Sequence, residues 1–183
     1  MTLTQRIVRP ALVTAGLLLV PLVAMQFTQE VAWTLSDFIV AGALLFGTGL
    51  AYELITSQRG NGAYRLAAGV ALATALLLVW VNLAVGLIGS EDNPANLLYG
   101  GVLAVGLVGA IIARFRPRNM ARTMLAAALV QFLVPVVALL IWKPELTLGV
   151  AQVFGANGLF VALWLGAALL FRRASPTGLE ASR

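Results

Sequence analysis

The chain has 183 residues, of which 61% are apolar and 10% are charged, and its mean hydropathy is +0.96. Soluble domains contain about 45–50% apolar residues, so this composition indicates an integral membrane protein. The chain contains neither cysteine nor histidine, which excludes disulfides, thiolate or imidazole metal sites, and catalysis by a cysteine or a histidine.

The net charge of +5 comes from arginines, and their distribution is typical of membrane topology, not of nucleic-acid binding. The single lysine, Lys143, lies at the end of an apolar stretch, which argues against a Schiff-base cofactor deep in the bilayer. We therefore expect no cofactor, no metal site, no nucleic-acid partner and no enzymatic activity.

Six apolar stretches predict six transmembrane helices. Each has about 17 to 23 residues, enough to cross a hydrocarbon core of about 30 Å at about 1.5 Å per residue. Helices are expected because backbone groups in lipid must be satisfied within the segment. The predicted fold is an all-α polytopic bundle, one domain over residues 1–171 with a short polar cytoplasmic tail at 172–183. The stretches cover residues 10–27, 38–55, 66–88, 97–113, 124–142 and 153–171.

Basic residues predict the orientation of these helices. Eleven of the twelve lie before the first stretch, between the second and third, between the fourth and fifth, or after the sixth. Cytoplasmic loops carry an excess of Lys and Arg, so both termini are expected in the cytoplasm. The loop with Glu91 and Asp92 is then expected to face the exterior.

Two pairs of short segments indicate an internal repeat. Residues 19–24 (LVPLVA) are similar to 133–138 (LVPVVA), and residues 95–99 (ANLLY) to 156–160 (ANGLF). These matches predict three related helical hairpins, in which Asp37, Asn96 and Asn157 are equivalent residues at outer helix starts. Chance similarity among segments rich in Leu, Val and Ala is the alternative.

Small residues recur every fourth position on the even-numbered helices. Such stripes let helix backbones approach closely, either within the bundle or against a second copy or a partner membrane protein. A narrow pathway lined by small side chains is the functional alternative. The stripes are Ala43, Gly47 and Ala51; Gly106 and Ala110; and Gly158, Ala162 and Gly166.

Two amides lie inside predicted helices. An amide in hydrocarbon costs a few kcal/mol unless it is paired, so Asn82 is expected to face the bundle interior or water. Gln131 lies one turn before Pro135, which frees a backbone carbonyl. We interpret Asn82 as a hydrogen-bond partner of Gln131 or Tyr99, or alternatively as a ligand-facing amide below an outward vestibule.

Polar residues at the outer helix starts have two interpretations. Asp37, Asn93, Asn96 and Asn157 fit helix capping, and Pro94 after Asn93 fits the first helical position. Alternatively, the carboxylates of Asp37, Glu91 and Asp92 form an acidic patch that binds a cation through oxygen ligands.

Glu53 lies near the predicted cytoplasmic end of the second helix. A carboxylate at this depth is expected to pair with an arginine, and Arg65 or Arg114 lies at the same level. A proton-relay role is the alternative.

The segments WTLSDFIVAG at residues 33–42 and VNLAVGLIGSEDNPAN at residues 81–96 resemble those of small six-helix inner-membrane proteins of bacteria. The resemblance implies a multi-pass protein of a bacterial inner membrane, and it implies no activity.

These patterns predict binding or transport of a small solute or cation through an outward-facing acidic vestibule. Its entrance is expected to contain Asp37, Asn82, Glu91 and Asp92, with Gln131 and Glu53 deeper. The alternative is a non-catalytic structural or accessory subunit that docks a partner through the small-residue faces. A lipid-modifying enzyme is a third reading, disfavoured by the missing histidine and cysteine.

Overall fold

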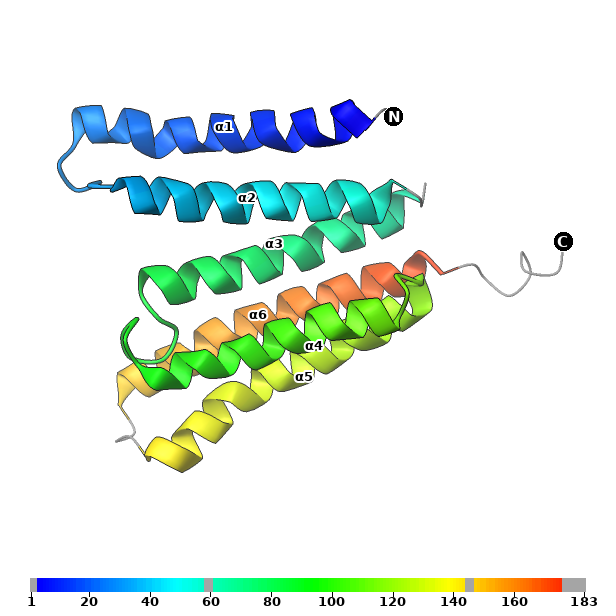
Figure 1. The fold of residues 1–183 in the computed structure, drawn as a ribbon. Coiled ribbons are helices and arrows are strands. Elements are labelled where there is room, and N and C mark those ends of the chain that lie inside the picture. The colour runs from blue at the N-terminus through cyan, green and yellow to red at the C-terminus, as the bar shows by residue number, and fades with distance from the viewer. Residues whose placement is uncertain (1–2, 58–60, 144–146, 176–183) are drawn as a thin grey trace, which may run out of the picture. The chain divides into compact units, whose positions relative to one another are not determined.

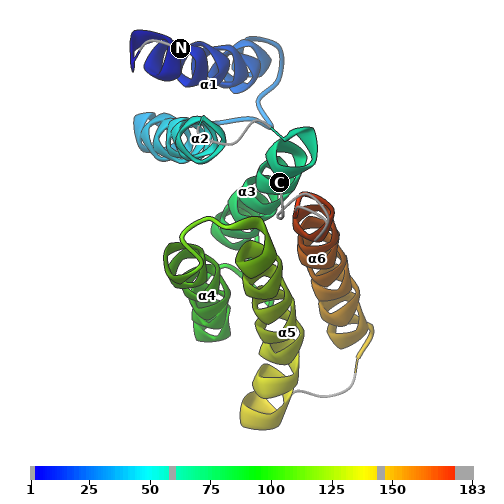
Figure 2. The same ribbon diagram turned by 90° about the vertical axis from the view of Figure 1, so that its right-hand side faces the viewer.

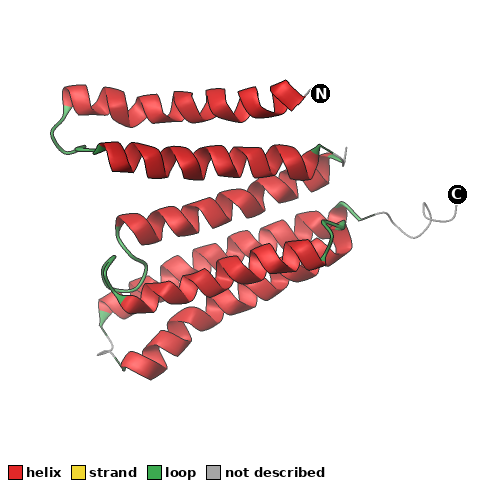
Figure 3. Cartoon of the chain, viewed as in Figure 1, coloured by secondary structure: helices red, strands yellow, loops and turns green. Residues whose placement is uncertain are grey.

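The computed structural model describes residues 3–57, 61–143 and 147–175. Within these ranges the elements are six α-helices and one 3₁₀ turn (Figure 3). Six helical segments are long and apolar enough to cross a membrane, which confirms the predicted all-α, six-helix membrane fold. The chain divides into two compact units, residues 1–58 and 59–183. The assignment of residues 1–171 to one domain stays a prediction.

The first unit is an antiparallel hairpin of α1 (Leu3–Phe27) and α2 (Leu35–Thr56) (Figure 1). Pro10, where the first apolar stretch was expected to begin, lies inside α1 and is buried. A Cβ at Gly49 would lie 2.8 Å from Cβ of Pro10. The missing side chain of Gly49 therefore lets the two helices approach closely at this point.

A capping box fixes the start of α2. The Asp37 carboxylate accepts hydrogen bonds from the backbone N–H of Thr34 (2.7 Å) and from its hydroxyl (2.8 Å). The Thr34 hydroxyl oxygen accepts from the backbone N–H of Asp37 at 3.4 Å. The rings of Trp33 and Phe38 pack edge to face across the cap, with centroids 5.2 Å apart. This reciprocal cap and hydrophobic staple explain why α2 begins at Leu35 instead of Phe38.

The second unit contains four long helices, α3 (Gly62–Ala84), α4 (Leu98–Ile112), α5 (Pro117–Trp142) and α6 (Leu148–Arg173). The short 3₁₀ helix η1 (Pro94–Leu97) leads into α4. α6 packs on both α3 and α5, and α4 packs on α5 (Figure 2). The main neighbours of α3 and α4 are thus α6 and α5, so the second hairpin of the predicted repeat is not closely packed.

One end of the second unit is tied by long-range contacts. The hydroxyl of Tyr64 on α3 donates to the carbonyl of Phe115, between α4 and α5, at 2.9 Å. The Tyr64 ring packs edge to face on Phe171 of α6. These contacts bring the start of α3, the arginine-rich connection at residues 113–116 and the end of α6 together. The side of the membrane on which this end lies stays a prediction.

Several helix boundaries in the second unit differ from the expected ones. α3 ends at Ala84 instead of Ile88, because Gly86 has a φ of +70° that no helix accommodates. α5 begins at Pro117, whose missing N–H is tolerated at the first helical position. α6 begins at Leu148, which places Asn157 well inside the helix. α6 also continues through Arg173, so residues 172–175 of the expected tail are structured and 176–183 lie outside the described residues.

The close approaches between helices use other glycines than the predicted stripes. A Cβ on Gly109 of α4 would lie 2.5 Å from Cγ2 of Thr123 on α5. By contrast, a Cβ added to a glycine of the predicted stripes would meet no atom within 4 Å. This holds for Gly47, Gly106, Gly158 and Gly166. Within each unit as described, these four glycines therefore make no close helix contact, and close packing through the stripes, in the bundle or against a second copy or partner, stays a prediction.

Replacement of Gly109 by alanine should destabilise the second unit. The added methyl group overpacks the contact with Thr123, which costs about 1–3 kcal/mol. Gly106→Ala on the same helix is the matched control, because its methyl group enters open space. The measurement is the apparent unfolding free energy in a denaturing-detergent titration. Equal stability of the two variants would contradict the role assigned to Gly109.

Candidate functional site

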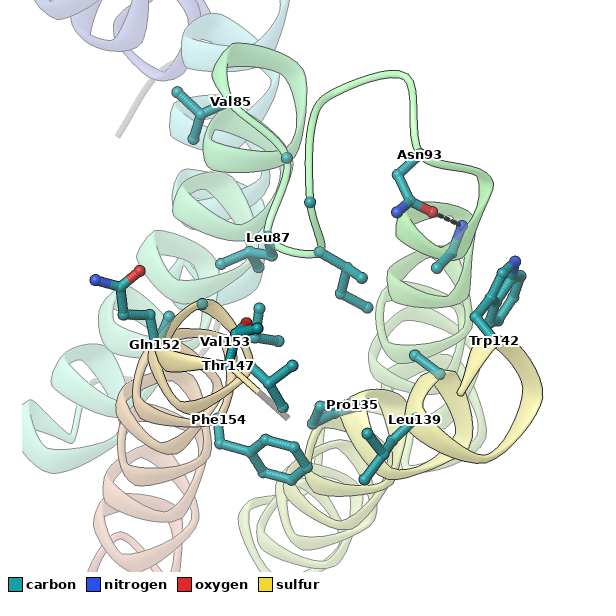
Figure 4. A pocket seen from close by; sticks show the side chains of 18 of the residues that line it. Val85, Leu87, Asn93, Pro135, Leu139, Trp142, Thr147, Gln152, Val153 and Phe154 are labelled. Atoms are coloured by element: carbon teal, nitrogen blue, oxygen red, sulfur yellow. Dashed lines mark hydrogen bonds between the residues drawn. The ribbon is translucent and has the colours of Figure 1, made fainter. Parts of the chain in front are cut away.

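A cleft of about 640 Å³ lies at the C-terminal end of α3 in the second unit (Figure 4). Tyr64 lies in the first turn of the same helix, at its other end. Its walls are the end of α3 with the loop that follows, the C-terminal half of α5 and the first turns of α6. Most lining residues are apolar, among them Val85, Leu87, Pro135, Leu139, Trp142 and Phe154. Polar lining side chains come from Asn93, Thr147 and Gln152. The site therefore offers an apolar surface with a few neutral polar groups.

Asn96 gives the loop wall of the cleft its shape. Its Oδ1 accepts hydrogen bonds from the backbone N–H groups of Leu87 (3.1 Å) and Ile88 (2.9 Å). Its Nδ2 donates to the carbonyls of Ser90 (2.7 Å) and Ile88 (3.3 Å). One side chain thus makes hydrogen bonds to four backbone groups that no helix pairs. Asn96 was expected to cap a helix, and it organises the loop instead.

Gly86 is the residue that permits this loop conformation. Its φ is +70°, and a Cβ would collide with the carbonyl group of Ser90 and lie 2.7 Å from Nδ2 of Asn96. At the end of the loop, Oδ1 of Asn93 accepts from the backbone N–H of Ala95 at 3.0 Å, and Pro94 is the first residue of η1. The predicted cap at Asn93 is confirmed.

A buried polar cluster joins α4, α5 and α6. Asn157 of α6 accepts a hydrogen bond from Nε2 of Gln131 at 2.9 Å. Its Nδ2 donates to the hydroxyl of Tyr99 (2.8 Å) and to the carbonyl of Val153 (2.8 Å). All three side chains are fully buried. Asn157 was expected at a helix start, equivalent to Asp37 and Asn96, and that prediction is wrong because α6 begins earlier.

Asn82 does not take part in this cluster. It lies in the last turn of α3, where its Nδ2 donates to the carbonyl of Leu78 within the same helix at 2.7 Å. The expected partners Gln131 and Tyr99 bond to Asn157 instead. In the described residues, Oδ1 of Asn82 and Oε1 of Gln131 are buried without a hydrogen-bond partner.

The six residues predicted to form the pathway are divided between the two units. Asp37 caps α2, and Glu53 is half-buried on the same helix; both belong to the first unit. Glu91 and Asp92 are exposed on the loop and do not line the cleft. Within either unit as described, no hydrogen bond joins two of the six. The acidic patch with Asp37 and the pairing of Glu53 with Arg65 or Arg114 would join the two units, so both stay predictions.

Neither the cleft nor the role of Asn157 was predicted from the sequence. A signal for Asn157 was present, because Thr147 is a residue type that begins helices. A helix assigned from Thr147 onward places Asn157 in the membrane interior, where an amide needs partners. The cleft has no comparable signal, since its walls come from three separate segments.

Asn96→Ala should expose the backbone of the loop. Loss of the side-chain oxygen leaves the N–H groups of Leu87 and Ile88 without their acceptor, so both amides should exchange hydrogen faster. Hydrogen exchange read by mass spectrometry on peptides covering residues 85–93 measures this effect. Ser90→Ala is the control, because it keeps the Ser90 carbonyl that Asn96 contacts. Unchanged exchange in Asn96→Ala would show that the loop does not depend on this side chain.

Asn157→Leu should destabilise the second unit more than Gln131→Leu. The first change leaves the Gln131 amide and the Tyr99 hydroxyl buried without their shared partner, at about 1–3 kcal/mol for each orphaned group. Gln131→Leu removes the hydrogen bond to Asn157, together with the side-chain oxygen Oε1 that already lacks a partner. Unfolding free energies in detergent titrations test the order, and a larger loss for Gln131→Leu would contradict the central position of Asn157.

The sequence matches no protein-family model and no curated protein, and the fold matches no solved structure.

Proposed function

We propose that the second unit binds a small, largely apolar molecule in the cleft. The observation that carries this proposal is the cleft itself, whose volume of about 640 Å³ falls within the roughly 300–1,000 Å³ of small-molecule sites. Its lining also has their composition, apolar side chains with a few polar groups. The sequence predicts an acidic vestibule, whereas the site proposed here is apolar. Glu91 and Asp92 lie on the exposed part of the loop that forms one wall of the cleft.

The hydrogen bonds of Asn96 support binding by a preformed site. They hold the loop wall in place, so less ordering entropy is lost when a ligand enters. The proposal concerns binding, and passage across the membrane needs a further step. A solute moving inward from the cleft meets the fully buried side chains of Tyr99, Gln131 and Asn157, which must separate to let it pass.

The proposed location is a bacterial inner membrane, with both termini in the cytoplasm and the cleft open to the exterior. The asymmetric distribution of arginines supports this orientation. In this orientation a ligand enters the cleft from the outer aqueous phase or from the outer leaflet.

A second candidate function is docking to a partner membrane protein or to a second copy. The open space beside Gly106, Gly158 and Gly166 favours it, because small residues that no helix of the second unit covers can accept a neighbouring helix. Native mass spectrometry from gentle detergent distinguishes the two candidates. A stoichiometric protein partner that is lost in Gly166→Leu supports docking, and a retained small molecule supports binding in the cleft.

Ala156→Phe should block the cleft. Ala156 is a lining residue, and a phenyl ring there takes space that a ligand needs. The probe is 6-bromohexan-1-ol, whose bromine quenches the fluorescence of Trp142 at the cleft. In lipid nanodiscs we expect saturable quenching, with a half-saturating concentration raised about tenfold by the substitution, equivalent to about 1.4 kcal/mol.

Two controls make this test specific. Trp142→Phe gives the quenching of the other tryptophans, which is subtracted. Ala151→Phe places the same ring on an exposed residue of α6 outside the cleft and should leave the half-saturating concentration unchanged. Quenching that does not saturate, or that is equal in Ala156→Phe and the unmodified protein, contradicts the proposed function.

A further inference from the structure

Two unpartnered amide oxygens lie one helical turn from the cleft. Oδ1 of Asn82 and Oε1 of Gln131 are both buried without a hydrogen-bond partner in the described residues. Val85, one turn after Asn82, lines the cleft, and so does Pro135, one turn after Gln131. Residues three and four apart share a helix face. Neither Asn82 nor Gln131 lines the cleft itself, so the two oxygens lie behind its wall, on the helix faces that form it.

The orientation of the Gln131 amide follows from its neighbours. The Val153 carbonyl accepts only, so the Asn157 side chain must turn its Nδ2 toward it. Oδ1 of Asn157 then faces Gln131, which must present its own NH₂ group. A flipped Gln131 amide would bring two oxygens together. The unpartnered Oε1 is thus a consequence of the hydrogen-bond network.

The same reasoning fixes the amide of Asn82. Its Nδ2 faces the carbonyl of Leu78 at 2.7 Å, and a flip would oppose two acceptors. The backbone adds a further acceptor on α5, because Pro135 has no N–H to donate to the carbonyl of Gln131. Buried acceptors thus accumulate at the cleft end of the unit. In the described part of this unit, the buried donor without a partner is Nε1 of Trp164, which lies about two turns beyond Asn157 on α6, away from the cleft.

We propose that the cleft selects neutral molecules that donate a hydrogen bond, with an O–H or N–H group accepted by Oδ1 of Asn82 or Oε1 of Gln131. This inference rests on the proposed function and names the class of ligand. A donor relieves the cost of a buried acceptor, whereas a molecule that only accepts leaves it in place. A neutral donor fits the described lining residues, because none of them carries a carboxylate that would offset the desolvation of a cation.

Two isomeric probes test this selection. 6-Bromohexan-1-ol donates a hydrogen bond through its hydroxyl group. Its isomer 1-bromo-5-methoxypentane also carries a terminal bromine, but its ether oxygen can only accept. Both are measured by quenching of Trp142 fluorescence, and each is corrected for its partitioning into protein-free nanodiscs. We expect the alcohol to half-saturate at about one fifth of the ether concentration, the effect of one net hydrogen bond.

The double variant Asn82→Leu/Gln131→Met should bind both isomers equally, since it has neither acceptor. The single variants then assign the preference to one oxygen. Tyr99→Phe is the matched control, because it removes a hydrogen bond of the same cluster but keeps both acceptors, and it should retain the preference.

The outcomes separate this inference from the proposed function. Equal saturable binding of the two isomers by the unmodified protein overturns the donor selection and leaves the cleft as a binding site. That result is also expected if resident water satisfies the two oxygens. A preference that persists in the double variant overturns the inference as well. Absence of saturable quenching by either probe rejects the proposed function itself.

Discussion

The second unit depends on the hydrogen bonds of one amide in the membrane interior. Lipid offers Asn157 no partner, so its side chain must find donors and acceptors on neighbouring helices. It finds them in Gln131 of α5, Tyr99 of α4 and the carbonyl of Val153. α4 packs mainly on α5, so the contact with Tyr99 adds a link from α4 to α6. The position of α4 in turn fixes Asn96, and Asn96 fixes the loop wall of the cleft.

Backbone polar groups find their hydrogen-bond partners in different ways at the two ends of this unit. At the Tyr64 end, an aromatic hydroxyl and ring connect three chain segments, and the space is filled by large side chains. At the cleft end, Asn96 and the positive φ of Gly86 let a loop fold on itself. The backbone polar groups of the loop are therefore hydrogen-bonded without large side chains that fill the space. The cleft is the space that this arrangement leaves between the loop, α5 and α6.

The sequence predicts those features that depend on local residues. Apolar length predicts six helices, and residue type predicts that Asp37 and Asn93 take part in helix capping. Features that depend on distant contacts are not predicted. Periodic glycines mark a helix face but do not indicate whether a neighbour covers it, which is why Gly109 makes a close contact and Gly106 does not. Asn157 was misplaced because an apolar window began its helix at Val153, and the cleft requires three segments to be placed together.

The two unpartnered amides have different explanations. Gln131 is needed by Asn157, so its free oxygen follows from a structural bond and by itself indicates no ligand. Asn82 has no such role, because its hydrogen bond to the Leu78 carbonyl stays within one helix turn. A leucine there would remove the unpartnered oxygen without breaking a contact between helices, and polar groups in a membrane interior are costly. Packing and stability thus account for Gln131 but not for Asn82. Asn82 is therefore the residue whose presence the structure explains least without a ligand.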